Sequence, residues 1–451
     1  MTPEQIENAV SAAMPQAVEE LKRLAAIPSV AFPGHPEEPV LAAAGMVEEL
    51  LRSTGLPRVQ QVPVEGSFPA VFGEAPAPPG MPTVLLYAHY DVQPAGDPAA
   101  WRTPPFEPTL IDGRLYGRGC ADDKSGVISH VTALRAFQGN FPVGIKVIIE
   151  GQEEYAGDRL EAFVERNPDL LRADTIVVAD TGNPRVGDPS VTTSLRGMAA
   201  FTVEVRTLRE PVHSGSFGGA APDALAALMR MLTALHDENG DIRVPGLPRG
   251  TFLGQGPSEE EFRQTAGVLD GVSLVGSGSL ADRLWASYAI TVTGLDVPSV
   301  SGAINAVQPV ARARVTVRVP PAGDPKTTVE AVADFLRQVA PWGVQVSFGD
   351  FTVGAGFQAD SGGKARAALN RAMERAFGRP PRDVGAGGSI PLVSALLKQF
   401  PAAEILLFGA EDEEASIHAP NERVDLEELR RIATTEALFL HELSLPSALG
   451  I

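Results

Sequence analysis

The sequence predicts an α/β protein with a mostly parallel central sheet and a smaller, inserted α+β domain. The first observation is a set of short apolar runs that alternate with helical patterns, at residues 83–88, 144–149, 175–179 and 404–408. Strands that are apolar on both faces and separated by helices are typical of a parallel sheet covered on both sides. The second observation is a change to alternating apolar and polar residues between 196 and 352, which predicts the insertion.

Apolar residues at helical spacing predict the helices of the larger domain. Residues 4–27 show this spacing around an interruption at Pro15. Further helices are expected at 124–137 and 159–165, each placed next to one of the apolar runs. Strands and helices that alternate in this way favour a mostly parallel sheet.

The inserted segment carries strands with one apolar and one polar face. Residues 311–319 alternate between Ala or Val and Arg or Thr, and residues 200–206 alternate in a similar way. Such alternation is typical of a sheet that is covered on one side only. Helical patterns at 222–235 and 327–339 are expected to cover the apolar side, and the Gly-, Pro- and acid-rich stretch 237–285 is expected to be irregular.

The predicted larger domain is therefore made of two separate stretches of chain. Residues 1–195 and 353–451 form it, and residues 196–352 form the insertion. A chain of 451 residues agrees with at least two domains, because an ordinary domain holds about 100–200 residues.

Composition argues against several classes of function. The 37 basic and 56 acidic residues give a net charge of −19, which disfavours binding to nucleic acid or to anionic lipid. The single Cys120 excludes an internal disulfide framework and a thiolate zinc cluster. No apolar run approaches the ~18 residues of a membrane span, and the N-terminus shows no secretory signal pattern. We expect a cytoplasmic protein.

Acidic and histidine side chains follow the predicted strands. They are His89 and Asp91 after the first run, Glu153 and Glu154 after the second, Asp180 after the third and His418 after the last, while Asp122 and Asp123 precede a predicted helix. Ligands of open α/β sheets bind at the carboxyl ends of the strands, so these side chains are expected to converge on one crevice.

Such a crevice needs positive charge. Several carboxylates in a partly buried cleft are unstable without a cation, and His with Asp or Glu but no Cys suits two divalent ions. Zinc leads, with cobalt and manganese as alternatives. Asp91 stands where it would orient a ring nitrogen of His89. A bridging carboxylate would hold two ions ~3.5–4 Å apart around a shared hydroxide.

Each motif alone has a simpler interpretation. Asp122 and Asp123 could cap a helix, and Glu153 and Glu154 could be solvated charges. It is the joint pattern that favours the metal site. The sequence contains no P-loop, no G-x-S-x-G elbow and no H-E-x-x-H helix. Four of its five other histidines lie in ordinary contexts: His35, His130, His236 and His441.

The motifs around these residues resemble those of the co-catalytic zinc exopeptidase and deacylase family. This family includes carnosinases, cytosolic nonspecific dipeptidases and bacterial dipeptidases, with glutamate carboxypeptidase, aminoacylase and succinyl-diaminopimelate desuccinylase as more distant members. The matching motifs, in order, are AHYDVQP at 88–94, GRGCADDKSG at 117–126, EGQEEYAG at 150–157, VVADTG at 177–182, VHSGSFGG at 212–219, GGSIP at 387–391 and IHAPNE at 417–422.

The resemblance implies a role for each matching residue. One metal would be bound by His89, Asp122 and Asp180, and a second by Asp122, Glu154 and His418, with Asp122 bridging and a cis peptide between Asp122 and Asp123. Glu153 would be the general base and Asp91 would orient His89. Substrate or intermediate contacts would come from His213, Asn305, Arg318 and Ser389.

The resemblance also implies a fold and an activity. It predicts an inserted ferredoxin-like lid, a homodimer through that lid, and hydrolysis of the amide bond of dipeptides or short peptides with a free carboxylate. An N-acyl-amino-acid deacylase with the same centre is the alternative, and a non-catalytic binding protein is less favoured. Gly385 and Ala386 depart from the Arg and acidic or small residue that many carnosinase-type dipeptidases carry before GGSIP.

Overall fold

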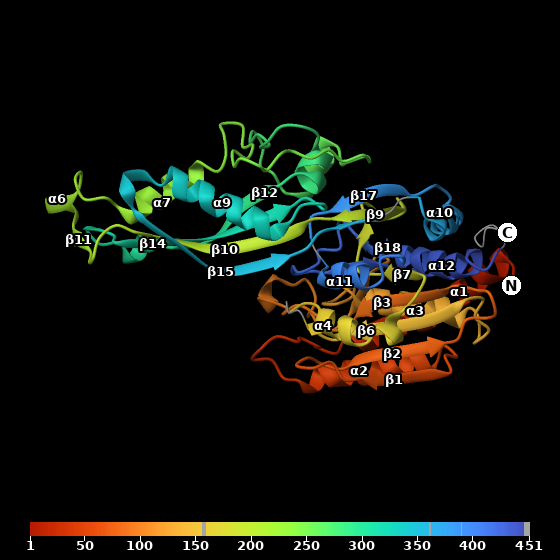
Figure 1. Cartoon of the computed structure of the whole chain (residues 1–451). Helices are drawn as coiled ribbons and strands as arrows, with labels where there is room; N and C mark the ends of the chain where they lie inside the picture. Colours follow the sequence, from red (N-terminus) through yellow and green to blue (C-terminus); the bar gives the residue numbers. More distant parts are fainter. Residues whose placement is uncertain (156–158, 360–361, 389, 446–451) are drawn as a thin grey trace. The chain divides into compact units, whose positions relative to one another are not determined.

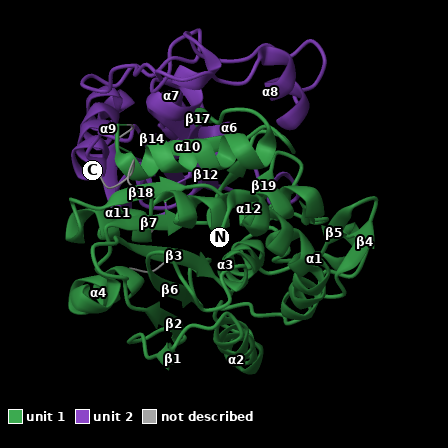
Figure 2. Cartoon of the chain, turned by 90° about the vertical axis from the view of Figure 1, so that its right-hand side faces the viewer, with its two compact units in different colours: residues 1–193, 359–383, 391–451 green, residues 194–358, 384–390 purple. Residues whose placement is uncertain are grey.

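The computed structural model describes residues 1–155, 159–359, 362–388 and 390–445 (Figure 1). It contains two compact units, coloured separately in Figure 2. Unit 1 comprises Met1–Thr193, Ala359–Asp383 and Pro391–Ile451, and unit 2 comprises Ser194–Gln358 and Val384–Ile390. The domain limits of 1–195, 196–352 and 353–451 stay a prediction.

The main sheet has the strand order β1-β2-β6-β3-β7-β18-β9-β16, and β17 also pairs with β9. Its four central neighbours, β6, β3, β7 and β18, run parallel, which confirms the predicted mostly parallel core. The other pairs with printed registers are antiparallel. The strands are β1 (Arg58–Val62), β2 (Ala70–Ala75), β3 (Thr83–His89), β6 (Gly144–Glu150), β7 (Thr175–Val178), β9 (Ser190–Leu195), β16 (Phe357–Gln358), β17 (Arg382–Ala386) and β18 (Glu404–Leu407).

Helices cover both faces of the sheet in unit 1. Figure 2 shows α4 and α11 on one face and α1, α3 and α12 on the other. The helices are α1 (Pro3–Ala25), α2 (Glu38–Arg52), α3 (Lys124–Arg135), α4 (Arg159–Arg166), α5 (Pro168–Leu171), α10 (Lys364–Phe377), α11 (Pro391–Gln399) and α12 (Leu426–Glu442). The three helices expected from apolar spacing are present, and Pro15 lies inside α1 without ending it.

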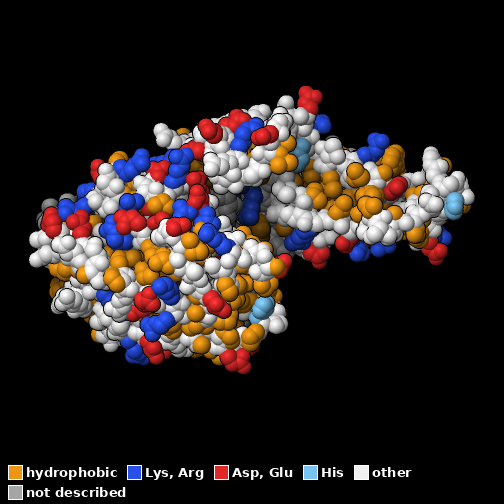
Figure 3. Space-filling model, turned by 180° about the vertical axis from the view of Figure 1, so that it is seen from behind, with side chains coloured by type: hydrophobic (Ala, Val, Ile, Leu, Met, Phe, Trp, Pro, Cys, Tyr) orange, Lys and Arg blue, Asp and Glu red, His pale blue; other side chains and the backbone are white. Residues whose placement is uncertain are grey.

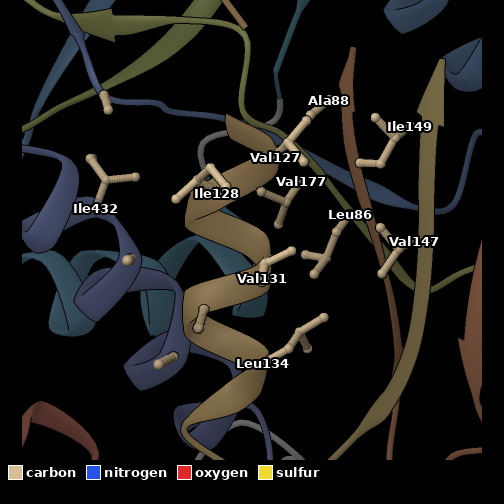
Figure 4. Close-up of a cluster of buried hydrophobic side chains, with 14 of the residues drawn as sticks. Leu86, Ala88, Val127, Ile128, Val131, Leu134, Val147, Ile149, Val177 and Ile432 are labelled. Atoms are coloured by element: carbon tan, nitrogen blue, oxygen red, sulfur yellow. The ribbon is translucent and has the colours of Figure 1, made fainter. Parts of the chain in front are cut away.

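The core of unit 1 forms where α3 packs on the parallel strands (Figure 4). Val127, Val131 and Leu134 of α3 and Leu86 of β3 are fully buried in it. Figure 4 shows the α3 side chains directed at the sheet, with Ile432 of α12 on the other side of the helix. Burying one such side chain contributes about 1.5–3 kcal/mol, so this packing stabilises α3 against the strands.

Unit 2 has the topology of a ferredoxin-like fold. Its sheet has the order β12-β14-β10-β15 with antiparallel neighbours, and two helices alternate with the strands as β-α-β-β-α-β. The elements are β10 (Gly197–Arg206), α7 (Ala224–Thr233), β12 (Ala289–Asp296), β14 (Val310–Val319), α9 (Pro325–Val339) and β15 (Gln345–Gly354). The expectation of an α+β insertion with one covered sheet face is confirmed.

Short elements complete the described chain. In unit 1 they are β4 (Thr109–Ile111), β5 (Arg114–Tyr116), β8 (Gly182–Asn183), β19 (Glu411–Asp412) and β20 (Arg423–Asp425). In unit 2 they include β11 (Val212–His213), α6 (Ser214–Phe217), α8 (Glu259–Thr265) and β13 (Ala306–Val307). Between α7 and β12 the chain is mostly irregular, as expected.

Surface and hydropathy agree with the compositional arguments. In the part of the chain that the structure describes, no helix combines the length and the apolar character that crossing a membrane requires. On the face drawn in Figure 3, acidic and basic side chains are intermixed, so the net charge of −19 is not gathered there in one patch.

Candidate metal centre

His89 ends β3 and brings an imidazole to the carboxyl edge of the sheet. The side chain is 1% exposed, and Nε2 lies 3.0 Å from Asp122 Oδ1 and 3.8 Å from Asp180 Oδ1. On the other side of the ring, Nδ1 lies 3.4 Å from Asp91 Oδ1. The Asp91 carboxylate also accepts the backbone N–H groups of Glu153 and Glu154, at 3.0 and 3.1 Å. Asp91 therefore links the end of β3 to the segment after β6.

His418 brings a second imidazole to the same carboxylates. Its Nε2 lies 2.9 Å from Asp122 Oδ2 and 3.0 Å from Glu154 Oε2. Asp122 thus presents one oxygen to each histidine, in the position expected of a bridging residue. Gln93 Nε2 donates to Glu154 Oε2 at 2.8 Å and fixes the orientation of that carboxylate.

Three groups of side chains have donor atoms close enough to hold an ion. Within each group one donor atom per residue lies within 4.8 Å of the others; the groups are His89, Asp123 and Asp180, then Asp122, Glu154 and His418, then Asp122, Asp180 and Glu411. The structure thus brings together every residue that the sequence places at the metal site. It adds Asp123, which was expected in the crevice but not as a metal ligand, and Glu411, which was not expected there.

Backbone hydrogen bonds hold the Asp122–Asp123 segment in place. Glu422 is fully buried, and its Oε1 accepts the N–H groups of Ala121 and Asp122 at 3.0 and 3.1 Å. Arg118 neutralises the other oxygen of Glu422 at 2.6 Å. Asp123 caps α3 and accepts the N–H of His89 at 3.1 Å. The peptide between Asp122 and Asp123 is cis, which confirms that expectation.

Contacts between histidine and carboxylate govern protonation in the two ligand groups. Burial opposes a charged ring at His89, but hydrogen bonds with Asp122 and Asp180 raise its pKa well above the usual value. Hydrogen bonds that the His418 ring donates to Asp122 and Glu154 raise the pKa of His418 to about 10. Burial acts to raise the pKa of Asp122, but the hydrogen bonds with His418 and His89 lower it. The two rings act as counter-charges for these carboxylates.

Other carboxyl groups at the centre are short of positive charge. Burial raises the pKa of Asp180 to about 6, and burial together with the charge of Asp180 raises the pKa of Glu153 well above its usual value. Burial also raises the pKa of Glu150 to about 8, although the Tyr87 hydroxyl donates to it at 2.5 Å. A divalent cation would stabilise all three as carboxylates, so the donor set fits metal ions.

Three of the four substrate residues expected from the resemblance are described, and they lie in unit 2. His213 in β11 is opposite Ala306 of β13, and the N–H of Ser214 donates to the Asn305 carbonyl at 3.0 Å, so His213 and Asn305 are neighbours. Both are exposed. Arg318 lies near the other end of β14, eight residues beyond Val310, roughly 27 Å along an extended strand. Ser389 lies outside the described residues.

Arg318 differs from the other arginines on its face of the sheet. Arg312 contacts Glu204 at 2.5 Å, and Arg314 donates to Thr352 Oγ1 at 3.2 Å. Arg318 has no acidic partner among the described residues, and burial lowers its pKa. Arg196 is 8% exposed, and the charge of Arg318 together with burial lowers its pKa to about 10. This end of the sheet therefore carries uncompensated positive charge in the described part of the chain.

Comparison with known proteins identifies the family to which the chain belongs. The model of peptidase family M20/M25/M40 matches residues 85–442, and the chain belongs to this family. It is accordingly a metallopeptidase, as the fold and the His/Asp/Glu cluster indicate.

Its relatives are dipeptidases by name. The chain is 43% identical over 366 residues to the cysteinylglycine-S-conjugate dipeptidase of Corynebacterium striatum, a match that covers 80% of each. It is 29% identical over 398 residues to the beta-Ala-His dipeptidase of Rattus norvegicus, covering 83% of this chain and 79% of the relative. The crystal structure of human carnosine dipeptidase 1 is similar with a TM-score of 0.82 at 25% identity, covering 98% of this chain and 99% of the other.

Proposed function

We propose that the protein is a dinuclear metal dipeptidase that hydrolyses the amide bond of dipeptides or short peptides ending in a free carboxylate. The observation that carries this proposal is Asp122, whose two oxygens lie against His89 and His418 in two adjacent ligand groups. The names of the relatives, which include Cys-Gly and beta-Ala-His dipeptidases, support the substrate class.

The side chains at the edge of the sheet would hold two ions. His89, Asp122 and Asp180 would hold one, and Asp122, Glu154 and His418 the other. Divalent ions, with zinc favoured by the His and carboxylate donors, would supply Lewis acidity and an acidic water. Gln93 and Asp91 keep Glu154 and His89 oriented for this purpose.

Glu153 would move the proton. Asp91 accepts the backbone N–H groups of both Glu153 and Glu154, but of these two glutamates only Glu154 belongs to a ligand group, with Asp122 and His418. With Glu154 turned to the His418 group, Glu153 is free to accept a proton from the attacking water and to return it to the leaving amine.

Residues of unit 2 would recognise the substrate. The guanidinium of Arg318 suits bidentate capture of the terminal carboxylate. His213 Nδ1 accepts the N–H groups of Gly215 and Ser216, so the neutral ring carries its proton on Nε2, as a donor to a developing oxyanion requires. Asn305 would add a second donor, and Ser389 a further contact.

His213 would act in the partner subunit of a homodimer. A dipeptide spans at most ~7 Å, whereas His213 and Asn305 are separated from Arg318 by most of the length of β14. One dipeptide molecule therefore does not contact both Arg318 and His213 of the same unit 2. A homodimer through unit 2 would supply Arg318 from one chain and His213 and Asn305 from its partner.

A panel of substrates tests the function. The purified protein with zinc, cobalt or manganese is expected to hydrolyse Cys-Gly and Ala-Gly, to lose activity on chelation and to regain it when metal is restored. Faster cleavage of acetyl- or succinyl-amino acids would favour the deacylase alternative. Binding of dipeptides without hydrolysis at full metal content would favour a non-catalytic protein, and full activity in a demonstrably metal-free sample would exclude the metal mechanism.

A further inference from the structure

Glu411 occupies a fixed position beside Asp180. Glu411 and Asp412 form β19, which pairs in parallel with β8, just after Asp180 in the chain. A Cβ on Gly182 would lie 2.3 Å from the Glu411 carbonyl oxygen, and a Cβ on Gly409 would lie 2.1 Å from that of Thr181. These backbones touch because both positions lack side chains, which keeps the Glu411 carboxylate at the metal centre.

The Glu411 carboxylate lacks a partner there. Its Oε1 is shielded from solvent and has no hydrogen-bond partner in the described part of the chain. One of its oxygens lies within 4.8 Å of oxygens of Asp122 and Asp180. By contrast, Asp91 receives two N–H groups and Asp122 faces two histidines. A shielded carboxylate oxygen without a partner favours the binding of a cation, since the carboxylate otherwise loses its charge by taking up a proton.

The ligand groups named above already account for two metals without Glu411. His89 and His418 each anchor one group, and the third group shares Asp122 and Asp180 with them and has no histidine of its own. A cation that Glu411 itself binds would then arrive with the substrate. The free α-amino group of a dipeptide is such a cation, and its nitrogen lies only about 2.5 Å from the carbon of the scissile carbonyl.

We propose that Glu411 is a specificity-determining residue that binds the free α-ammonium group of the dipeptide while the scissile carbonyl lies at the metal centre. This inference rests on the proposed function and names the group that distinguishes a dipeptide from an N-acyl amino acid. A substrate without the ammonium group leaves the shielded Oε1 of Glu411 unpaired, which is the arrangement that lets a site reject an analogue.

The test compares two ligands that differ in this group. Ala-Gly and propionyl-Gly share a skeleton, but only Ala-Gly carries the ammonium. Glu411→Gln keeps the size of the side chain and removes its charge. A charge-assisted hydrogen bond is worth a factor of about 10–100, so kcat/KM for Ala-Gly is expected to fall by that factor. The inhibition constant of propionyl-Gly is expected to stay within about threefold of the wild-type value, or to improve.

Metal content and a matched variant separate the outcomes. Glu413→Gln removes a nearby carboxylate that contacts Arg185 at 3.7 Å. It is expected to change neither kcat/KM for Ala-Gly nor the inhibition constant of propionyl-Gly. Glu411→Gln is expected to keep the wild-type metal content. Loss of an ion from Glu411→Gln, or equal weakening of both ligands, would make Glu411 a metal ligand and overturn the proposal.

The remaining outcomes distinguish this inference from the function on which it rests. Unchanged kcat/KM for Ala-Gly in Glu411→Gln, with an active wild type, would reject only the role of Glu411. A wild type that hydrolyses no dipeptide at full metal content would reject the proposed function and the ammonium site with it.

Discussion

The carboxyl edge of the sheet in unit 1 and the polar face of the sheet in unit 2 each collect charge of one sign, but they differ in what neutralises it. On the face of unit 2, Arg312 is exposed and lies against Glu204 from the neighbouring strand. At the edge in unit 1, His89, Asp91 and Asp122 are 5% exposed or less, and acidic groups outnumber the histidines.

The difference shows when a charged residue is evidence of function. An exposed ion pair contributes about 0–1 kcal/mol and can change without consequence, so most of the arginines on the unit 2 face need no further explanation. A buried carboxylate without a counter-charge costs far more, and a chain that keeps several must receive a cation. Arg318 and Arg196 are the exceptions on the unit 2 side, because they are partly or largely buried and have no carboxylate in the described part of the chain.

The largest effects are expected at the edge of unit 1, from two neighbouring glutamates with different tasks. Glu153→Gln removes the base but no metal contact, so kcat is expected to fall by at least ~10²-fold with metal content unchanged. Glu154→Gln removes an oxygen that contacts His418, so one metal is expected to be lost or weakened, with partial rescue by added zinc. Kinetics and elemental analysis on both variants measure these effects. If Glu153→Gln lost an ion and Glu154→Gln kept both, Glu153 would be the metal ligand and Glu154 the base.

An intermediate effect is expected at Arg318, with Arg312 as the matched control on the same face. Arg318→Ala is expected to raise KM about 10–100-fold for dipeptides with a free carboxylate and much less for their amides, because a charge-assisted bond is lost only from the acid. Arg312→Ala is expected to change KM less than twofold, since its partner Glu204 is on the exposed sheet face. Equal effects of Arg318→Ala on acids and amides would make Arg318 a solvated charge like its neighbour.

The parts of the fold that the sequence predicts are those that depend on local pattern. Both the parallel core and the α+β insertion follow from runs of buried or alternating residues, whereas the ferredoxin-like form of the insertion is implied by the family resemblance. The position of the site at the edge of the sheet follows from polar residues at strand ends. The sequence could predict that His89, Asp180 and Glu154 lie close together, because the carboxyl ends of parallel strands meet at one edge of the sheet.

Other features depend on contacts that sequence spacing does not reveal. Glu422 is the last residue of IHAPNE, but its two hydrogen bonds to the backbone of Ala121 and Asp122 join segments some 300 residues apart. Glu411 stands a few residues after β18, as the other strand-end acids do after theirs, and that signal alone could have singled it out. Its closeness to Asp180 depends on bare backbone at Gly182 and Gly409.

The smallest effect on activity is expected at His130. This residue pairs with Glu436 in unit 1, away from the carboxyl edge of the sheet. Its Nδ1 lies 2.7 Å from Glu436 Oε2 and its Nε2 lies 3.0 Å from the Tyr87 carbonyl, so a protonated ring would donate from both nitrogens. Burial acts to lower the pKa of His130, but the charge and hydrogen bond of Glu436 raise it above 6.5.

Both ring nitrogens of His130 have partners within the fold, while Glu436 Oε1 has no hydrogen-bond partner in the described part of the chain. Because the pair lies away from the metal centre, it is expected to affect stability and leave catalysis unchanged. Because the folded pKa is raised, the stabilisation is fully present below the unfolded value of 6.5 and is lost as pH rises through the folded value. His130→Gln is expected to destabilise most at low pH and to flatten the decline of the unfolding free energy above pH 6.5, with kcat/KM changed less than twofold. Urea unfolding from pH 5 to 9 measures the slope. A slope identical to that of the wild type would mean that His130 is neutral in the folded chain, and a large loss of kcat/KM without loss of stability would connect this pair to the metal centre.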